Sequence, residues 1–176
     1  QFRLLTLSAW YPHKNLSIIP KVLDVLIKKG YKNIVFVVTL PKEDMAKLCL
    51  VDKYEGQLVN TGQVKVEEGA SLYQECDAMF LPSLLECFSA SYAEAMQLNK
   101  PIITSDMGFA HTVCKDAALY VNSMDADDIA SKIIELSTSY ELQQDLVSKG
   151  VKRLEVFGSS HDRAKRYLEI CEALIK

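Results

Sequence analysis

Short hydrophobic runs alternate along the chain with longer stretches in which apolar residues recur at helical spacing. Residues 33–40 form an unbroken, largely β-branched run, which is typical of a strand buried on both faces. Residues 17–30 place apolar side chains on one helical face and end in Lys-Lys-Gly, which favours a helix that stops at Gly30. This alternation predicts an α/β fold built on a doubly wound parallel sheet.

About six strands are expected, separated by helices. The expected strands cover residues 2–8, 33–40, 57–62, 77–82, 101–105 and 117–121. The expected helices cover residues 17–30, 41–51, 69–76, a run through Met96, a short helix or turn at 109–116, then 125–137, 141–157 and 161–175. No repeat or linker interrupts the pattern, so residues 1–176 are interpreted as a single domain. Ligands of such sheets bind beyond the carboxyl ends of the strands, so functional residues are expected in the strand-to-helix loops.

Composition excludes several classes of function. The formal charge of −3 provides no basic surface for nucleic acid. No apolar run approaches the length of a membrane-spanning helix. The chain begins directly with an apolar strand, so a preceding segment of the natural protein is expected.

The cysteines and histidines suggest neither a metal site nor a thiol nucleophile. Cys49, Cys76 and Cys171 lie in helical, apolar surroundings and are interpreted as reduced core residues of a cytosolic protein. Cys87 has no base close in sequence that would activate it. No metal-ligand spacing surrounds His111, so no metal site is predicted from the sequence.

Residues 82–106 (PSLLECFSASYAEAMQLNKPIITSD) are the most informative stretch of the chain. A buried strand, a loop, a helix and a Pro-led strand make a βαβ unit. Ser89 is expected to cap the helix, and small residues after it leave the first-turn N–H groups open to an anion. Glu86 precedes the helix and Glu94 lies inside it. This layout suits a sugar nucleotide, with its diphosphate at the helix N-terminus and hydroxyl-bearing groups on either side.

This stretch resembles the E-x7-E element of retaining glycosyltransferases with the GT-B fold, particularly family 4 (glycosyl transferases group 1). Those sequences read close to P-S-x-x-E-G-F-G-x-x-x-x-E-A-M, followed by a Pro-led strand. The chain keeps Pro82, Ser83, Glu86, Phe88, Glu94, Ala95, Met96, Pro101, Ile103 and Ser105. It departs from the pattern at Cys87 and Ser89, where the family has Gly.

The resemblance implies that the chain is the Rossmann-like C-terminal half of a GT-B enzyme. An N-terminal domain of the same full-length chain would complete the active-site cleft. The implied function is donor binding in a retaining, metal-independent transferase. The enzyme would move a hexosyl group from a nucleotide diphosphate sugar to a glycan or lipid-linked acceptor in polysaccharide biosynthesis. No further cofactor is implied. The expected location is cytoplasmic, or at the inner face of the membrane through the N-terminal domain, and this half alone is expected to be inactive.

The resemblance also implies roles for individual residues. In its first loop the family reads G-R-x-x-x-x-K-G, where Lys14 matches the Lys, Asn15 replaces the Gly and Ala9 replaces the Arg. Lys14 and Glu86 are the expected catalytic residues, and Glu94 is expected to accept hydrogen bonds from the ribose diol. The expected contacts to the nucleotide sugar are made by Lys14, His13, Phe88, Ser89, Glu94, Gln63 and Val64.

Two alternatives remain open from the sequence. Nucleotide-sugar epimerases and phosphorylases share the GT-B fold, although the E-A-M core and Lys14 favour a transferase. A non-catalytic Rossmann-like binding domain is the other alternative, although the chain lacks the acidic cluster that receiver domains carry after their first strand. Tyr73 matches a family position only loosely and is expected to pack in the core.

Overall fold

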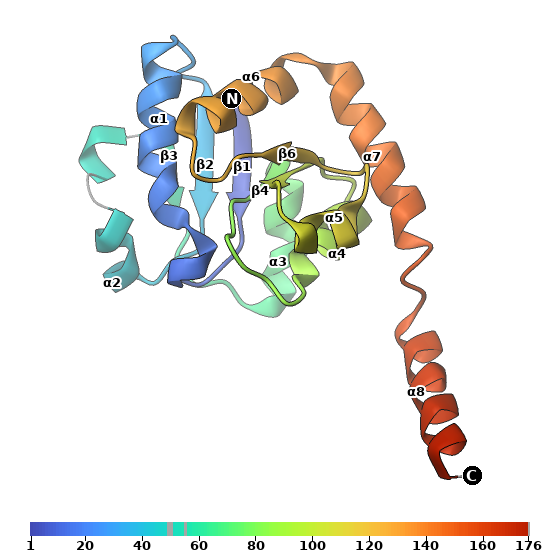
Figure 1. Ribbon diagram of the computed structural model, residues 1–176. Helices are drawn as coiled ribbons and strands as arrows, with labels where there is room; N and C mark the ends of the chain where they lie inside the picture. The colour runs from blue at the N-terminus through green and yellow to red at the C-terminus, as the bar shows by residue number, and fades with distance from the viewer. Residues whose placement is uncertain (49–50, 55, 176) are drawn as a thin grey trace.

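Parallel strands at the centre of the molecule form one sheet (Figure 1). The computed structural model describes residues 1–48, 51–54 and 56–175. The strands are β1 (Phe2–Thr6), β2 (Ile34–Val38), β3 (Leu58–Asn60), β4 (Ala78–Leu81), β5 (Ile102–Ser105) and β6 (Leu119–Val121). Their order is β3-β2-β1-β4-β5-β6, and every pairing is parallel. The doubly wound, six-stranded prediction is therefore confirmed, with the strand order of dinucleotide-binding folds.

Helices follow the strands in the expected alternation. They are α1 (Ile19–Lys28), α2 (Lys42–Met45), α3 (Val66–Gln74), α4 (Ala90–Gln97), α5 (Gly108–Cys114), α6 (Ala126–Thr138), α7 (Tyr140–Leu154) and α8 (Ser160–Ile175). Of the helix expected over 41–51, the structure describes residues 41–48 and 51. These hold the short α2, a 3-10 turn at Ala46–Leu48 and the start of another 3-10 turn at Val51. Helix α3 begins earlier than expected, because the Glu68 carboxylate accepts the Lys65 N–H at 2.8 Å.

Two hydrophobic clusters cover the two faces of the sheet. Successive residues of a strand point to opposite faces, and Leu4 and Leu5 accordingly belong to different clusters. The first cluster joins the sheet to α1 and α6, and the second joins it to α3, α4 and α5 (Figure 1). Asp125 caps α6, since its carboxylate accepts the N–H groups of Asp127 and Asp128. These packed layers fix the loops at the carboxyl edge of the sheet.

The chain reverses its direction of winding between β1 and β4, which are neighbours in the sheet. Strands β2 and β3 lie on one side of this point, and β5 and β6 lie on the other. The loops that leave β1 and β4 therefore diverge from adjacent strand ends. In open α/β sheets this switch point is where ligands bind.

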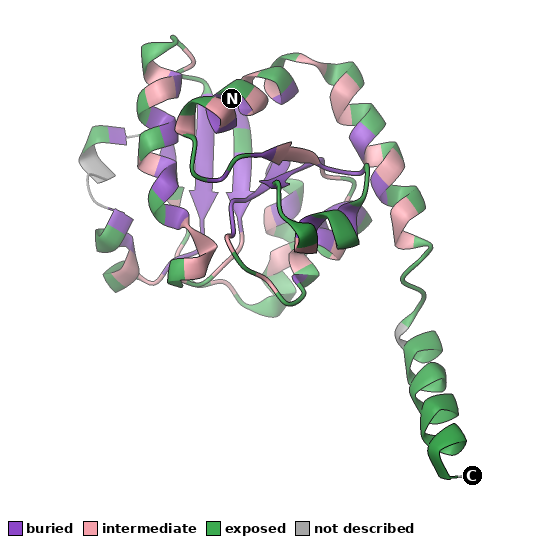
Figure 2. Ribbon diagram, in the orientation of Figure 1, coloured by how far each residue is buried: buried purple, intermediate pink, exposed green. Residues whose placement is uncertain are grey.

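Helix α8 extends away from the rest of the molecule (Figure 1). Every side chain from 161 to 175 is exposed (Figure 2). The prediction that Cys171 is a core residue is therefore wrong, because helical periodicity marks an apolar face without showing what covers it. Cys76 is buried as expected, and Cys49 lies outside the described residues. None of the helices in the described parts of the chain is long and apolar enough to cross a membrane.

Candidate functional site

Lys14 and Glu86 meet at the β1/β4 switch point. Lys14 ends a 3-10 turn in the loop after β1, and Glu86 lies in the loop after β4. The ammonium Nζ donates to Glu86 Oε1 at 2.6 Å, and only 17% of the Lys14 side chain and 8% of the Glu86 side chain are exposed. Ser83 donates to the same Oε1 at 2.8 Å. In the described part of the chain no hydrogen bond reaches Glu86 Oε2, so that oxygen can accept one from a ligand.

The loops of β1 and β4 are also joined through their backbones. The Leu84 N–H donates to the His13 carbonyl at 2.7 Å. The His13 ring stacks on the exposed Tyr11 ring, with centroids 5.5 Å apart and an angle of 14° between the planes. His13 therefore lies beside the ion pair, and its carbonyl helps to hold the opposite loop in place; its expected contact with the nucleotide sugar stays a prediction.

Asn15 gives the loop of Lys14 its shape. Its φ of 54° and ψ of 32° place it in the left-handed region, which favours Gly and which Asn tolerates better than most residues. Its side-chain Nδ2 donates to the Ser123 carbonyl at 2.8 Å. The backbone conformation suited to a glycine is therefore kept at this position, and the amide adds a bond to the loop after β6.

Three buried serines extend this bond across the carboxyl edge of the sheet. Ser123 Oγ donates to Ser105 Oγ, and Ser105 Oγ donates to the Ser83 carbonyl at 2.5 Å. Ser83 in turn donates to Glu86. A connected hydrogen-bond network thus links the chain around Lys14 to Glu86 through the ends of β6, β5 and β4. The sequence pattern does not connect these serines, although each lies at or just after the end of a strand.

Phe88 and Ser89 form the entrance to α4. Ser89 occupies the N-cap position with an extended backbone, as expected, but its hydroxyl makes no capping hydrogen bond. The expectation of a side-chain cap is therefore wrong, and the first-turn N–H groups receive no side-chain acceptor. A helix N-terminus in this condition favours an anion. Phe88 is 57% exposed, and with Glu94 and Arg163 it lines a cavity of about 420 Å³.

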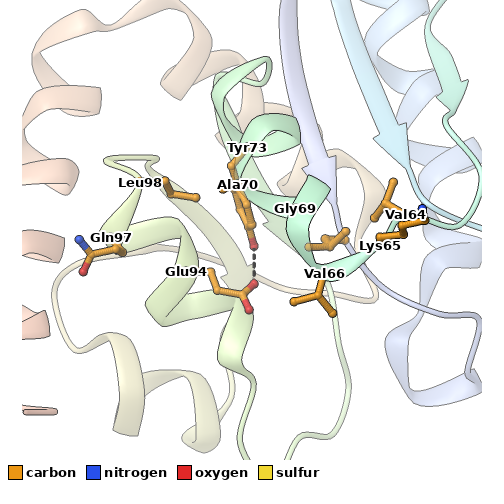
Figure 3. Close-up of a pocket in the computed structure, with 10 residues that line it drawn as sticks. Val64, Lys65, Val66, Gly69, Ala70, Tyr73, Glu94, Gln97 and Leu98 are labelled. Atoms are coloured by element: carbon orange, nitrogen blue, oxygen red, sulfur yellow. Dashed lines mark hydrogen bonds between the residues drawn. The ribbon is translucent and has the colours of Figure 1, made fainter. Parts of the chain in front are cut away.

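A second cavity, of about 450 Å³, brings together residues from distant parts of the sequence (Figure 3). Its lining includes Leu7, Val64, Lys65, Val66, Gly69, Ala70, Tyr73, Glu94, Gln97 and Leu98. Gln63 lines an adjacent cavity of about 250 Å³ that shares Leu7 and Val64 with it. Gln63 and Val64, both expected to contact the nucleotide sugar, therefore lie on the same side of the molecule as Glu94.

The loop after β5 carries a pair that the sequence analysis did not anticipate. His111 Nε2 lies 2.6 Å from Asp106 Oδ1, and the His111 ring stacks on Tyr120 with centroids 3.8 Å apart. A helical turn brings the two side chains together across five positions. Across residues 1–48, 51–54 and 56–175, no group of three or more His, Cys, Asp or Glu side chains is arranged to hold a metal ion.

Comparison with known proteins gives consistent matches. The family model for glycosyl transferases group 1 matches residues 1–153. The O-antigen chain mannosyltransferase RfbU of Salmonella typhimurium is 30% identical over 131 residues, which is 73% of this chain and 36% of RfbU. The chain therefore spans about a third of this curated relative.

Solved structures of glycosyltransferases share the fold. An S. aureus TarM mutant in complex with Fondaparinux, alpha-GlcNAc-glycerol and UDP matches with a TM-score of 0.82 and 17% identity, over 95% of this chain and 34% of TarM. Sucrose-phosphate synthase from Thermosynechococcus elongatus matches with a TM-score of 0.81 and 18% identity, over 99% of this chain and 45% of that one. The catalytic domain of the Helicobacter pylori cholesterol-alpha-glucosyltransferase matches with a TM-score of 0.74 and 17% identity, over 89% of this chain and 99% of that domain. Together with the family model, these matches show that the chain belongs to the glycosyl transferases group 1 family and carries a domain of the GT-B fold.

Proposed function

We propose that this chain is the donor-binding domain of a retaining, metal-independent glycosyltransferase. The enzyme moves a hexosyl group from a nucleotide diphosphate sugar to a glycan or lipid-linked acceptor. The observation that carries the proposal is the meeting of Lys14 and Glu86 at the switch point of the sheet, beside the uncapped N-terminus of α4. A cation, a carboxylate and free N–H groups are the chemistry that a glycosyl diphosphate requires.

The leaving diphosphate is stabilised electrostatically in this scheme. Negative charge builds up on the diphosphate as the glycosidic bond loosens, and positive groups already in position lower the barrier. An ammonium has three N–H donors, so Lys14 can keep one on Glu86 and direct another to a phosphate oxygen. The N–H groups after Phe88 and Ser89 add the partial positive charge of the helix end. These groups provide the positive charge that other enzymes obtain from a metal ion, which supports the proposal of metal independence.

Glu86 is proposed to orient the sugar. Its Oε1 is occupied by Lys14 and Ser83, which fixes the carboxylate and leaves Oε2 as an acceptor for a sugar hydroxyl. A reacting sugar must be held within a small range of angles for rapid transfer. Because Glu86 lies beside Lys14, Glu86 can contact the sugar while Lys14 contacts the diphosphate. The groups on both sides of the bond that breaks are then held.

The cavity of about 450 Å³ is proposed to take the nucleoside. Val64 and Leu7 offer apolar contact to a base, while Glu94 presents a carboxylate to the ribose diol. Pockets that combine apolar walls with a few polar groups are typical for small ligands. Gln63, in the adjacent cavity, is proposed to lie near the edge of the base.

The carboxyl edge is proposed to face an N-terminal domain of the same full-length chain. Large apolar side chains are exposed in the loops after four strands. They are Tyr11 after β1, Leu85 and Phe88 after β4, Met107 after β5 and Met124 after β6. The exposure of these apolar side chains at the carboxyl edge supports the proposal that another domain covers this edge and also holds the acceptor.

Family membership favours a transferase over an epimerase, a phosphorylase or a non-catalytic domain. The printed name of RfbU, an O-antigen chain mannosyltransferase, supports a hexosyl donor and a place in polysaccharide biosynthesis. The proposed location is cytoplasmic, or at the inner face of the membrane through the N-terminal domain.

Calorimetric titration of this chain with UDP, GDP and ADP tests the proposal. Weak binding of at least one of them is expected, because one side of the cleft provides only part of the contacts. Nucleosides without phosphate serve as the control and should bind more weakly still. The absence of heat with all three diphosphates at millimolar concentration would count against donor binding.

A further inference from the structure

Tyr73 makes contacts beyond the core packing expected of it. The residue lies in α3 and is 1% exposed. Its hydroxyl reaches across to α4, where it lies 3.3 Å from the Ser91 carbonyl and 3.4 Å from Glu94 Oε2. Figure 3 shows the phenol pointing at the Glu94 carboxylate on the wall of the 450 Å³ cavity. A side chain needed only for packing has no requirement for a polar atom at this point.

We propose that Tyr73 is a positioning residue for Glu94: its buried hydroxyl holds the carboxylate at the cavity wall, ready to accept hydrogen bonds from the ribose diol of the donor. The inference rests on the proposed function and deepens it, because it adds a residue that acts through Glu94 without touching the nucleotide.

Tyr73 and Glu94 differ in conformational freedom, and this difference explains how the hydrogen bond between them raises nucleotide affinity. The phenol ring packs in the core cluster of α3, α4 and α5, so its position is fixed. Glu94 is exposed and has several rotatable bonds, and ordering such a side chain on binding reduces affinity. A hydrogen bond already made in the free protein removes part of that cost. It engages Oε2 and leaves Oε1 to accept from a ligand.

The phenol remains a donor under all physiological conditions. Burial, followed by the negative charge of Glu94, raises the pKa of Tyr73 well above its ordinary value. The proton shared with Glu94 and the Ser91 carbonyl is therefore always present.

The test is the Tyr73→Phe variant of the natural full-length chain, which keeps the ring and removes only the hydroxyl. Affinity is measured by calorimetry for UDP, GDP and ADP and for the 2′,3′-dideoxy form of whichever binds best. We expect the variant to bind the ribonucleotide about three- to tenfold more weakly, the effect of one ordinary hydrogen bond. Its affinity for the dideoxy form should be unchanged, because that ligand lacks the diol.

Tyr92→Phe is the matched control. Tyr92 is equally buried, and its hydroxyl lies 2.8 Å from Thr104 Oγ1, so the variant loses a comparable hydrogen bond that does not involve Glu94. It should bind both ligands like the wild type. In a double variant, Tyr73→Phe should add nothing to the loss caused by Glu94→Gln.

The outcomes separate the inference from the proposed function. A Tyr73→Phe variant that binds the ribonucleotide as tightly as the wild type would overturn the positioning role. So would one that loses equal affinity for both ligands, because that pattern reports general damage to the fold. A wild-type protein that binds none of the three diphosphates would instead reject the proposed function itself, and the inference with it.

Discussion

Lys14 Nζ lies 2.6 Å from Glu86 Oε1, although the two residues are 72 positions apart in the sequence. The contact joins the loops of two adjacent parallel strands, and both side chains are largely buried. A partly buried pair of this kind loses more solvation than a surface pair, so removal of either partner leaves an uncompensated charge.

Lys14→Ala and Glu86→Ala should each reduce turnover of the full-length enzyme. Loss of one charge-stabilising donor lowers kcat by roughly 10²- to 10³-fold in enzymes that rely on such groups. Lys14 should have an effect at the upper end, because Ala9 occupies the position of the usual second cation. Steady-state kinetics with the cognate donor provide the measurement. Lys149→Ala, which removes a surface pair with Asp145, is the control, and normal turnover of Lys14→Ala would exclude Lys14 from the phosphate site.

Glu94→Gln should weaken nucleotide binding with little effect on folding. The change keeps the shape of the side chain and removes its charge, so affinity should fall by roughly 1–3 kcal/mol, the range for hydrogen bonds to charged groups. Calorimetry measures the affinity, and thermal melting measures the stability. Glu135→Gln removes an exposed carboxylate of α6 and should alter neither. If Glu94→Gln melts early yet binds normally when folded, then Glu94 has a structural role.

Asn15 should tolerate Gly better than Ala. Both variants lose the hydrogen bond to the Ser123 carbonyl, but Ala must also adopt the left-handed backbone, which costs roughly 1–2 kcal/mol. Gly adopts that backbone without strain, at a smaller cost in unfolded-state entropy. Denaturant unfolding should therefore give Asn15→Ala a lower free energy of unfolding than Asn15→Gly. Equal values would indicate that the loop relaxes away from this conformation.

The cysteines should divide into two classes of reactivity. Burial raises the pKa of the Cys76 thiol to about 11 and that of Cys114 to about 12, so both should resist alkylation in the folded protein. Cys87 and Cys171 are exposed and should react first. Mass spectrometry after iodoacetamide treatment measures the extent of alkylation at each cysteine. A bound nucleoside diphosphate should slow the reaction of Cys87 selectively, since Cys87 adjoins Glu86, and protection of Cys171 instead would place the ligand elsewhere.

Residues 1–176 alone should transfer no sugar, whatever donor and acceptor are supplied. Retaining transfer requires acceptor and donor to be held at contact distance, and the proposed second wall of the cleft lies on another domain. A radiolabelled-donor assay with the full-length enzyme as positive control would measure this. Robust transfer by these residues would overturn the two-domain proposal.

The periodicity of the sequence was sufficient to predict the fold class and most elements. Strand β2 is the clearest case, because a continuous β-branched run has few alternatives to a doubly covered strand. Within residues 41–48 the helix is shorter than expected, since the apolar positions there also suit a short helix followed by a 3-10 turn. The prediction that Cys171 is buried is wrong, because an apolar helical face in the sequence does not show which element, if any, covers it.

The sequence predicts the parts of the site whose residues lie close together along the chain. It does not predict the contacts that depend on which strands and helices are neighbours in the fold. Glu86, Ser89 and Glu94 surround one helix, so their arrangement follows from the βαβ pattern. The pairing of Lys14 with Glu86 depends on β1 and β4 being neighbours, which local periodicity does not specify. The same holds for the contact of Tyr73 with Glu94, which depends on the packing of α3 against α4.

The exposure of helix α8 affects amide hydrogen exchange and thermal melting of the chain. With every side chain from 161 to 175 exposed, its helical state is supported by local hydrogen bonds and the Ser159–Asp162 contacts at its start. An isolated helix of this length is marginal in water. We therefore expect its amide protons to exchange with solvent faster than those of β1 or β4, and its unfolding to be largely independent of that of the sheet. A melting curve of this chain should consequently report the stability of the strands and the helices packed on them, and little about the sixteen-residue helix α8.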